Sequence, residues 1–375
     1  MSSASDIVKR IKDEEIEWVD VRFTDPKGKW QHLSMCAGLI DEDQLEEGFM
    51  FDGSSIEGWK VINESDMILK PDLDAVYVDP FSATPMLVIF CNIVEPSDGS
   101  LYARDPRSTA KRAEAFLKST GLGDTVYVGV EPEFFMFDDV RFFDGYNGSG
   151  FEIDDIELPT NTGTEMEGGN LGHRPRAKGG YFPVAPVDSC MDIRAEMVST
   201  MLEMGLPMDK QHHEVAAAQH ELGMTFGQLT ETADRTQVYK YVTQMVADAY
   251  GKTATFMPKP IKEDNGSGMH THMSIWKDGQ NTFAGDNTPV FRKTASITSA
   301  ASSSTPRHVT LSPTRRPTAT SVWSRALKRL CCWPIRPVTA LLLAVFHMVR
   351  VKRPSALNSV SRIHSPTLTC PPQLC

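Results

Sequence analysis

The chain has 375 residues, of which 41% are hydrophobic and 23% charged, and its formal net charge at pH 7 is −11. This length is enough for two domains, and the composition is ordinary for a globular protein. The longest apolar run, residues 340–349, is far shorter than the ~20 residues of a membrane-spanning helix. The first ten residues lack the apolar core of a secretory signal, and the seven cysteines lack metal-ligand spacing. We therefore expect a cytoplasmic protein with no membrane or nucleic-acid partner.

The charge is divided sharply along the chain. All 49 acidic residues and all 26 glycines lie in residues 1–286. Residues 287–375 hold 13 Lys and Arg, which leaves 25 of the 38 basic residues for residues 1–286. The first segment therefore carries 25 − 49, or −24, and the second carries +13.

Two explanations of residues 287–375 are open. A nucleic-acid or membrane arm would be basic, but such an arm is normally rich in Lys and lacks segments such as Cys331-Cys332-Trp333. Translation in a wrong reading frame would give the observed mixture of Ser, Thr, Pro and Arg with four of the seven cysteines. We favour the frame shift and expect this anomalous basic tail to be disordered over about 290–375.

The N-terminal part of the chain has the pattern of a small mixed α/β domain. Residues 18–23 and 29–34 alternate as two strands around a turn at 25–28, and residues 74–95 supply further strands. We place this domain at residues 1–103 and a second domain at residues 104–286.

Three helices are expected in the second domain. Asp105 suits an N-cap, Pro106 the first helical position and Gly121 a C-terminal stop, which predicts a helix over 106–120. Apolar residues at three- and four-residue spacing predict two more, over 190–204 and 233–250.

Two expected strands carry groups that bind metals. Over residues 126–134, a period of two puts three valines on one face and Glu131 and Glu133 on the other. Over residues 269–275, His270, His272 and Ser274 share one face. A solvated strand end and hydrogen-bonded structural histidines are the alternatives to a metal site.

The segment from His212 to Glu221 is ambiguous. Glu214 and Glu221 are seven residues apart and would share one face of a helix. Periodicity alone does not distinguish a helix here from two strands joined by a turn. Together with Glu131, Glu133 and His270, these carboxylates suggest hard divalent cations that handle the phosphates of a nucleotide. The chain has neither a P-loop nor a dinucleotide-binding glycine motif, so the nucleotide would be held in another way.

Over about residues 5–286 the chain closely resembles glutamine synthetases of the bacterial class I type. The resemblance rests on an ordered series of segments: Phe51-Asp-Gly-Ser-Ser55, Glu131-Pro-Glu-Phe-Phe135, Lys178-Gly-Gly-Tyr-Phe-Pro-Val-Ala-Pro-Val-Asp-Ser189, His212-His-Glu-Val-Ala216, Gln219-His-Glu221 and Asn265-Gly-Ser-Gly-Met-His-Thr-His-Met-Ser274. It implies an α+β fold, with a β-grasp-like N-terminal domain and a catalytic domain on a curved antiparallel sheet with flanking helices. It also implies ligation of ammonia to glutamate with ATP, through γ-glutamyl phosphate, in a ring-shaped dodecamer with active sites between subunits.

The resemblance also implies a role for each matched residue. Two ions, Mg²⁺ or Mn²⁺, would be bound, one by Glu133, Glu214 and Glu221 and the other by Glu131 and His270. The remaining roles are glutamate binding by Asn265 and Gly266, ATP binding by Asp209, Phe226, His272 and Ser274, and ammonium binding and deprotonation by Asp52, whose loop includes Ser55. At Asp209 the family usually has Glu, a mild departure.

The larger departure lies after residue 286, where the family continues for more than a hundred residues. That stretch includes arginines for glutamate and phosphate, a flap over the site and a further metal ligand, none of which we can match in residues 287–375. An impaired or inactive remnant that still binds nucleotide or metal, or that assembles with an intact homologue, is therefore the alternative function. A ligase for a different amine is disfavoured by Asp52, because an ammonium site suits the smallest nucleophile.

Sequencing the gene around the codons for Gly285 to Arg292 tests the frame-shift interpretation. We expect an inserted or deleted nucleotide there, with the family pattern resuming in another frame. An intact frame through these codons would refute it.

Overall fold

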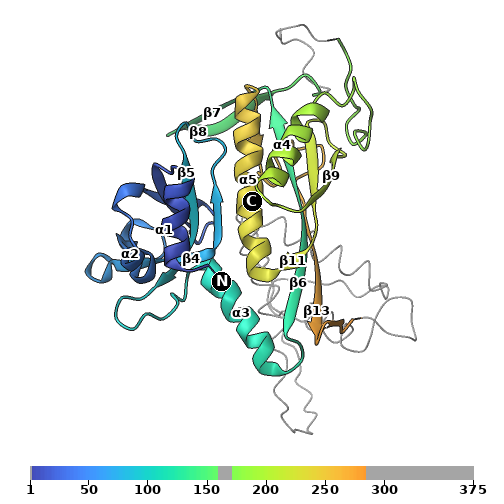
Figure 1. Ribbon diagram of the computed structural model, residues 1–375. Coiled ribbons are helices and arrows are strands. Elements are labelled where there is room, and N and C mark those ends of the chain that lie inside the picture. Colours follow the sequence, from blue (N-terminus) through green and yellow to red (C-terminus); the bar gives the residue numbers. More distant parts are fainter. Residues whose placement is uncertain (1, 159–170, 284–375) are drawn as a thin grey trace, which may run out of the picture.

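A computed structural model describes residues 2–158 and 171–283 (Figure 1). The predicted disorder of residues 290–375 and the expected tail at 287–375 lie outside these residues. No helix in the two described ranges is long and apolar enough to cross a membrane.

The N-terminal domain is built on a five-stranded mixed sheet, drawn in blue in Figure 1. Its strands are β1 (Trp18–Thr24), β2 (Trp30–Cys36), β3 (Phe49–Asp52), β4 (Asp66–Val78) and β5 (Met86–Val94), in the order β2-β1-β5-β4-β3. Only β1 and β5 pair in parallel. Helices α1 (Ala4–Asp13) and α2 (Glu42–Glu47) pack their apolar residues into the core of this sheet. The result is the predicted β-grasp domain.

Asp52 is expected in a loop with Ser55, but the structure places both Phe51 and Asp52 in strand β3. Asp52 pairs with Asp66 of β4, and only the short 3₁₀ turn Gly53–Ser55 follows the strand. Asp52 therefore ends a strand, and the loop that includes Ser55 begins at Gly53.

The second domain is built on a curved seven-stranded antiparallel sheet, as predicted. Its main path is β14-β13-β6-β10-β9, and two short strands, β11 and β12, also pair with β6. The strands are β6 (Thr125–Phe137), β9 (Met208–His213), β10 (Gln219–Met224), β11 (Gly227–Gln228), β12 (Thr253–Thr255), β13 (Met269–Lys277) and β14 (Gln280–Asn281).

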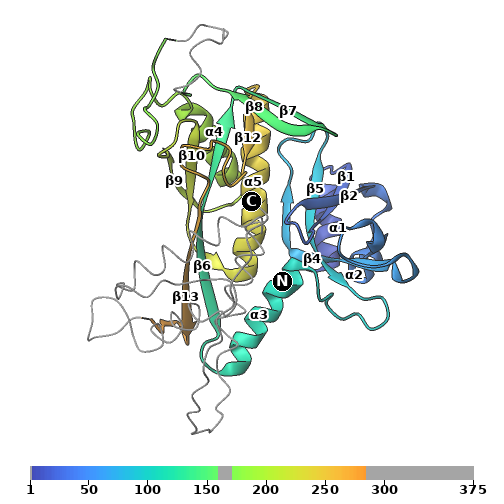
Figure 2. The ribbon, with the colours of Figure 1, turned by 180° about the vertical axis from the view of Figure 1, so that it is seen from behind.

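Three helices cover one face of this sheet, as Figure 2 shows from behind. Helix α3 (Pro106–Thr120) has the predicted Asp105 cap and a left-handed Gly121 at its end. Helices α4 (Met191–Glu203) and α5 (Leu229–Ala249) confirm the other two predictions, although α5 begins four residues before the predicted start at 233. A capping box between Gln228 and Glu231 sets the true start, ahead of the apolar periodicity.

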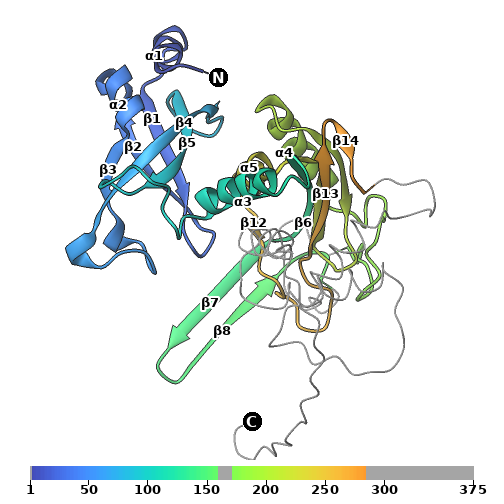
Figure 3. The same cartoon turned by 90° about the horizontal axis from the view of Figure 1, so that it is seen from below.

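A hairpin of β7 (Asp139–Gly145) and β8 (Gly148–Asp154) follows β6 and projects from the domain (Figure 3). Most of its side chains are exposed on both faces, so it lacks the one-sided alternation that predicts a half-buried strand.

A buried arginine ties the two domains together. Arg107 of α3 contacts Asn92 of β5 at 2.6 Å, Asp72 of β4 at 2.9 Å and Asp234 of α5 at 2.8 Å. Burial raises the pKa of Asp234, although Arg107 opposes that shift. Arg107 is therefore the counter-charge for two carboxylates that come from different domains.

Arg107→Met should lower the free energy of unfolding by about 3–5 kcal/mol, because Asp234 loses its buried counter-charge, although Asp72 keeps its pair with Lys111. Arg10→Met is the control, since Arg10 forms a partly exposed i,i+4 pair with Glu14 that is worth at most about 1 kcal/mol. Urea unfolding followed by circular dichroism measures both. Equal losses from the two variants would contradict the role given to Arg107.

Candidate functional site

Strand β6 lies at the centre of the candidate site. Its register with β13 sets Glu131 opposite His270, and its register with β10 sets Glu133 opposite Glu221. Strand β10 in turn sets Glu221 opposite His212 of β9. Four adjacent strands therefore bring these five side chains into one row across the sheet.

The row lies on the face of the sheet opposite the helices. Val126, Val128 and Val130 are buried in the core that α3, α4 and α5 share, as the period of two predicts. Because side chains alternate along a strand, Glu131 and Glu133 point to the other face. Directly paired residues of neighbouring strands share a face, so His270 and Glu221 point there too.

Glu214 reaches the same place from a turn. The ambiguous segment 212–221 forms two antiparallel strands, β9 and β10, with Glu214 just after β9. One ligand atom each from His212, Glu214 and Glu221 lies within 4.8 Å of the others. The structure thus brings together all five residues predicted to bind metal and adds His212.

The electrostatics of the cluster favour a cation. Burial, together with the nearby charges of Glu214, Glu221 and Glu131, raises the pKa of Glu133 to about 7. Burial likewise raises the pKa of Glu214. Within the described part of the chain, the ion pairs of these carboxylates are with imidazole rings. Crowded carboxylate oxygens with an imidazole form a donor set that fits a hard divalent cation.

The glycine-rich loop at residues 265–268 is hydrogen-bonded to Glu133. The backbone N–H of Gly268 donates to Glu133 Oε2 at 2.8 Å, and a Cβ on Gly268 would come within 2.8 Å of Glu133 Oε1. The amide of Gln219 donates to Glu133 Oε2 at 2.7 Å and to the carbonyl of Gly266 at 3.0 Å. The predicted glutamate-binding residues Asn265 and Gly266 therefore lie in a loop joined to the carboxylates.

The residues predicted to bind ATP continue the same face. Phe226 is 62% exposed and lies against Tyr127 with ring centroids 5.5 Å apart. A Cβ on Gly129 would be 3.4 Å from Cβ of Phe226 and 4.0 Å from Cβ of His272. Because Gly129 has no side chain, it leaves space between Phe226 and His272, two of the four residues predicted to bind ATP.

Ser274 and Asp209 lie at the two ends of this region. Ser274 is opposite Tyr127 in the register, and its Oγ accepts a 2.9 Å bond from Trp276. Asp209, on β9, lies where a Cβ on Gly223 of β10 would point, so its carboxylate is on the same face as Glu221.

Asp52 and Ser55 lie apart from this cluster, on the N-terminal sheet. Figure 3 shows β3 in that sheet, away from β6 and β13. Asp52 accepts hydrogen bonds from the backbone N–H of Ser54 at 2.8 Å and from Oγ of Ser55 at 3.0 Å. Bonds from Ser54 and Ser55 hold the pKa of Asp52 below its usual value. No hydrogen bond or ion pair between described residues joins Asp52 to the carboxylates of β6 and β10.

Sequence reasoning missed His212, Gln219 and Gly268. A period of two from Glu221 back to Gln219 would have placed Gln219 on the face of the carboxylates. The cross-strand pairing of His212 with Glu221 depends on the register of β9 and β10, which the sequence alone does not supply.

Gly268→Ala should weaken binding of Mn²⁺ about 10-fold or more, because the added methyl would displace Glu133 from its loop. Gly38→Ala is the control, since Gly38 has ordinary backbone angles and nothing within 4 Å of an added Cβ. Isothermal titration of each purified chain with Mn²⁺ measures the difference. Unchanged affinity in the Gly268 variant would exclude Glu133 from the ion site.

Two protein families match successive parts of this chain. The family described as "Glutamine synthetase, catalytic domain" matches residues 103–300, and "Glutamine synthetase, beta-Grasp domain" matches residues 15–96. The chain is 61% identical over 287 residues to glutamine synthetase of Rhizobium meliloti (strain 1021), and 60% identical over 286 residues to that of Bradyrhizobium diazoefficiens. Each alignment covers 76% of this chain and 61% of the relative, so the chain spans about three fifths of their length.

A solved structure shows the same fold. The cryo-EM structure of Plasmodium falciparum glutamine synthetase superposes with a TM-score of 0.75 at 28% identity, covering 80% of this chain and 59% of the other. The catalytic-domain match spans more than half of the 375 residues. The chain therefore belongs to the glutamine synthetase family.

Proposed function

We propose that the site contributes to ATP-dependent ligation of ammonia to the side-chain carboxylate of glutamate, which forms glutamine. The observation that carries the proposal is the row of Glu131, Glu133, Glu221 and His270, with Glu214, on the face of the sheet opposite the helices. The sequence relatives named above are glutamine synthetases, which is the reason to assign this ligation to the row.

Two divalent ions, Mg²⁺ or Mn²⁺, would be held by different parts of the row. Glu133, Glu214 and Glu221 would bind one ion, with His212 beside them, and Glu131 and His270 would bind the second. Such ions would neutralise the phosphate oxygens while a phosphoryl group moves from ATP to glutamate. The acyl phosphate formed in this way, γ-glutamyl phosphate, makes the glutamate carbon reactive toward ammonia.

The nucleotide would lie along β6 and β13, beside the ions. Phe226 would pack against the base, and His272 and Ser274 would contact the nucleotide from β13, with Asp209 contributing from β9. Asn265 and Gly266 would bind glutamate in the loop that already bonds to Gln219. In this order along the sheet, the terminal phosphate would lie nearest the carboxylates.

Asp52 would bind ammonium and accept its proton, since ammonium must lose a proton to become a nucleophile. Its low pKa keeps it ionised near neutral pH, as a cation-binding carboxylate requires. Asp52 lies on the other domain of its own chain, so we propose that it serves the site of a neighbouring copy. This arrangement supports assembly into a ring, for which a dodecamer is the family's expected form.

A second candidate is a remnant that binds metal or nucleotide without making glutamine. The observation that favours it is composition, because residues 287–375 contain no acidic residue and no glycine, unlike residues 1–286. Glutamine formation distinguishes the two candidates, since both predict metal binding.

Purified chain should form glutamine only when ATP, glutamate, ammonium and Mn²⁺ are all present. Asp52→Asn should lower kcat by about 10²-fold or more, because it removes the proton acceptor, while leaving Mn²⁺ affinity unchanged. Coupled measurement of ADP and of glutamine by chromatography checks both expectations.

Asp98→Asn is the matched control, because Asp98 is also exposed and accepts a bond from the N–H two residues on, as Asp52 does. It should leave the rate unchanged. Binding of Mn²⁺ and ATP without glutamine under every condition would reject the ligase in favour of the remnant.

A further inference from the structure

A buried carboxylate outside the proposed ligand set lies next to the turn that carries Glu214. Glu157, just after the β7–β8 hairpin, is fully buried, and its two oxygens accept four hydrogen bonds. Oε1 accepts from the backbone N–H of Ser189 at 2.9 Å and from its hydroxyl at 2.6 Å. Oε2 accepts from the backbone N–H of Ala218 at 2.9 Å and from His213 Nε2 at 2.8 Å.

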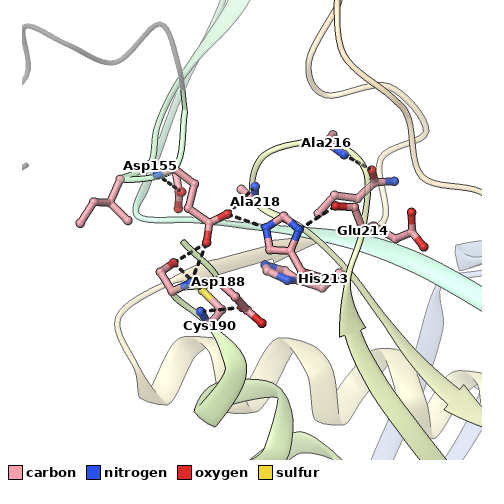
Figure 4. A network of polar contacts seen from close by, with 12 residues as sticks. Asp155, Asp188, Cys190, His213, Glu214, Ala216 and Ala218 are labelled. Carbon is pink, nitrogen blue, oxygen red and sulfur yellow. Dashed lines mark hydrogen bonds and ion pairs between the residues drawn. The ribbon is translucent and has the colours of Figure 1, made fainter. Parts of the chain in front are cut away.

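These four donor groups belong to three residues, which come from two segments that meet at the cluster. Ser189 precedes α4, whereas His213 and Ala218 are at the two ends of the turn that contains Glu214. Figure 4 shows Ala218 and Glu214 close to the ring of His213, with Cys190 and Asp188 of the other segment nearby. The carboxylate of Glu157 therefore joins the start of α4 to both ends of the turn.

His213 connects Glu157 directly to the backbone of Glu214. Its Nδ1 contacts the backbone carbonyl of Glu214 at 2.6 Å, and a carbonyl only accepts, so Nδ1 donates. Its Nε2 lies 2.8 Å from Glu157 Oε2, so the imidazole ring bridges the carboxylate of Glu157 and the backbone of Glu214.

The backbone of Glu214 is then held on both sides. Its N–H donates to the carbonyl of Gln219 at 2.7 Å, and its carbonyl accepts from His213. The next carbonyl, of Val215, accepts from Gly180 at 2.9 Å. Ala218 has a left-handed φ of 57°, an unfavourable angle for a residue other than glycine that its bond to Glu157 helps to maintain.

We propose that Glu157 is a positioning residue for the metal site, which orients Glu214 through His213 and the Ala218 backbone. This inference rests on the proposed function, because it takes Glu214 to be a ligand. Glu157 itself is not one of the proposed ligands. Partners behind the ligands of a metal commonly change affinity about 10–100-fold when they are replaced.

Glu157→Gln is the direct test, because four donors require an acceptor-only group. Whichever way the amide is turned, its NH₂ would face two donors, so one pair of contacts is lost. We expect Mn²⁺ affinity of the full-length chain to fall about 10–100-fold, measured from the electron paramagnetic resonance signal of free Mn²⁺. Glu157→Asp keeps the acceptor charge and should recover part of the affinity; it also serves if the Gln variant does not fold.

Asp105→Asn separates positioning from a general loss of stability. Asp105 is equally buried and also accepts four hydrogen bonds, from Ile93, Arg107 and twice from Ser108, but at the start of α3. It should lower the unfolding midpoint as Glu157→Gln does and leave Mn²⁺ affinity unchanged.

Three results would overturn the inference. Unchanged affinity in both Glu157 variants would show that Glu214 needs no support from Glu157. An equal loss of affinity in Asp105→Asn would show that only stability matters. No Mn²⁺ binding by the unchanged chain would reject the proposed metal site itself, which distinguishes failure of the proposed function from failure of this inference.

Discussion

The register of β6 is the constraint on which the rest of the site depends. This strand pairs with β13, β10, β11 and β12, and a shift by one residue would exchange its two faces. Burying a valine stabilises the fold by about 1.5–3 kcal/mol, whereas burying an unpaired carboxylate is strongly unfavourable. Val126, Val128 and Val130 under the helices therefore hold Glu131 and Glu133 on the opposite face of the sheet. The apolar side of the strand determines where the chemical side points.

The sequence predicts the parts of the fold that follow from local rules. The cap at Asp105 and the stop at Gly121 place α3, and alternation identifies the two faces of β6. The hairpin β7–β8 was missed because both of its faces are largely exposed. The start of α5 was misplaced because a capping box lies ahead of its apolar periodicity. Local hydrophobic patterns therefore miss a strand that is exposed on both faces and misplace a helix start that a capping box sets.

The candidate site likewise has a part that local patterns predict and a part that depends on which strands pair. Alternation puts Glu131 beside Glu133, and His270 beside His272, from the sequence alone. Which strands become neighbours is a long-range property, so the pairs Glu131–His270 and Glu133–Glu221 emerge only from the sheet order. His212 and Gly268 were missed for this reason, since each matters through a partner distant in the sequence. The ordered motifs of the family supplied the grouping that periodicity did not.

The carboxylates of the cluster differ in how strongly the surrounding structure restrains their backbone. Glu131, Glu133 and Glu221 lie on strands whose ladder bonds restrain them, and Gly268 adds a further bond to Glu133. Glu214 lies in a turn, where backbone groups are ordinarily more mobile. A ligand set is only as well defined as its least restrained member, since each ligand atom must meet the same ion. The buried bonds of Glu157 and His213 give this turn a restraint that the strands obtain from their neighbours.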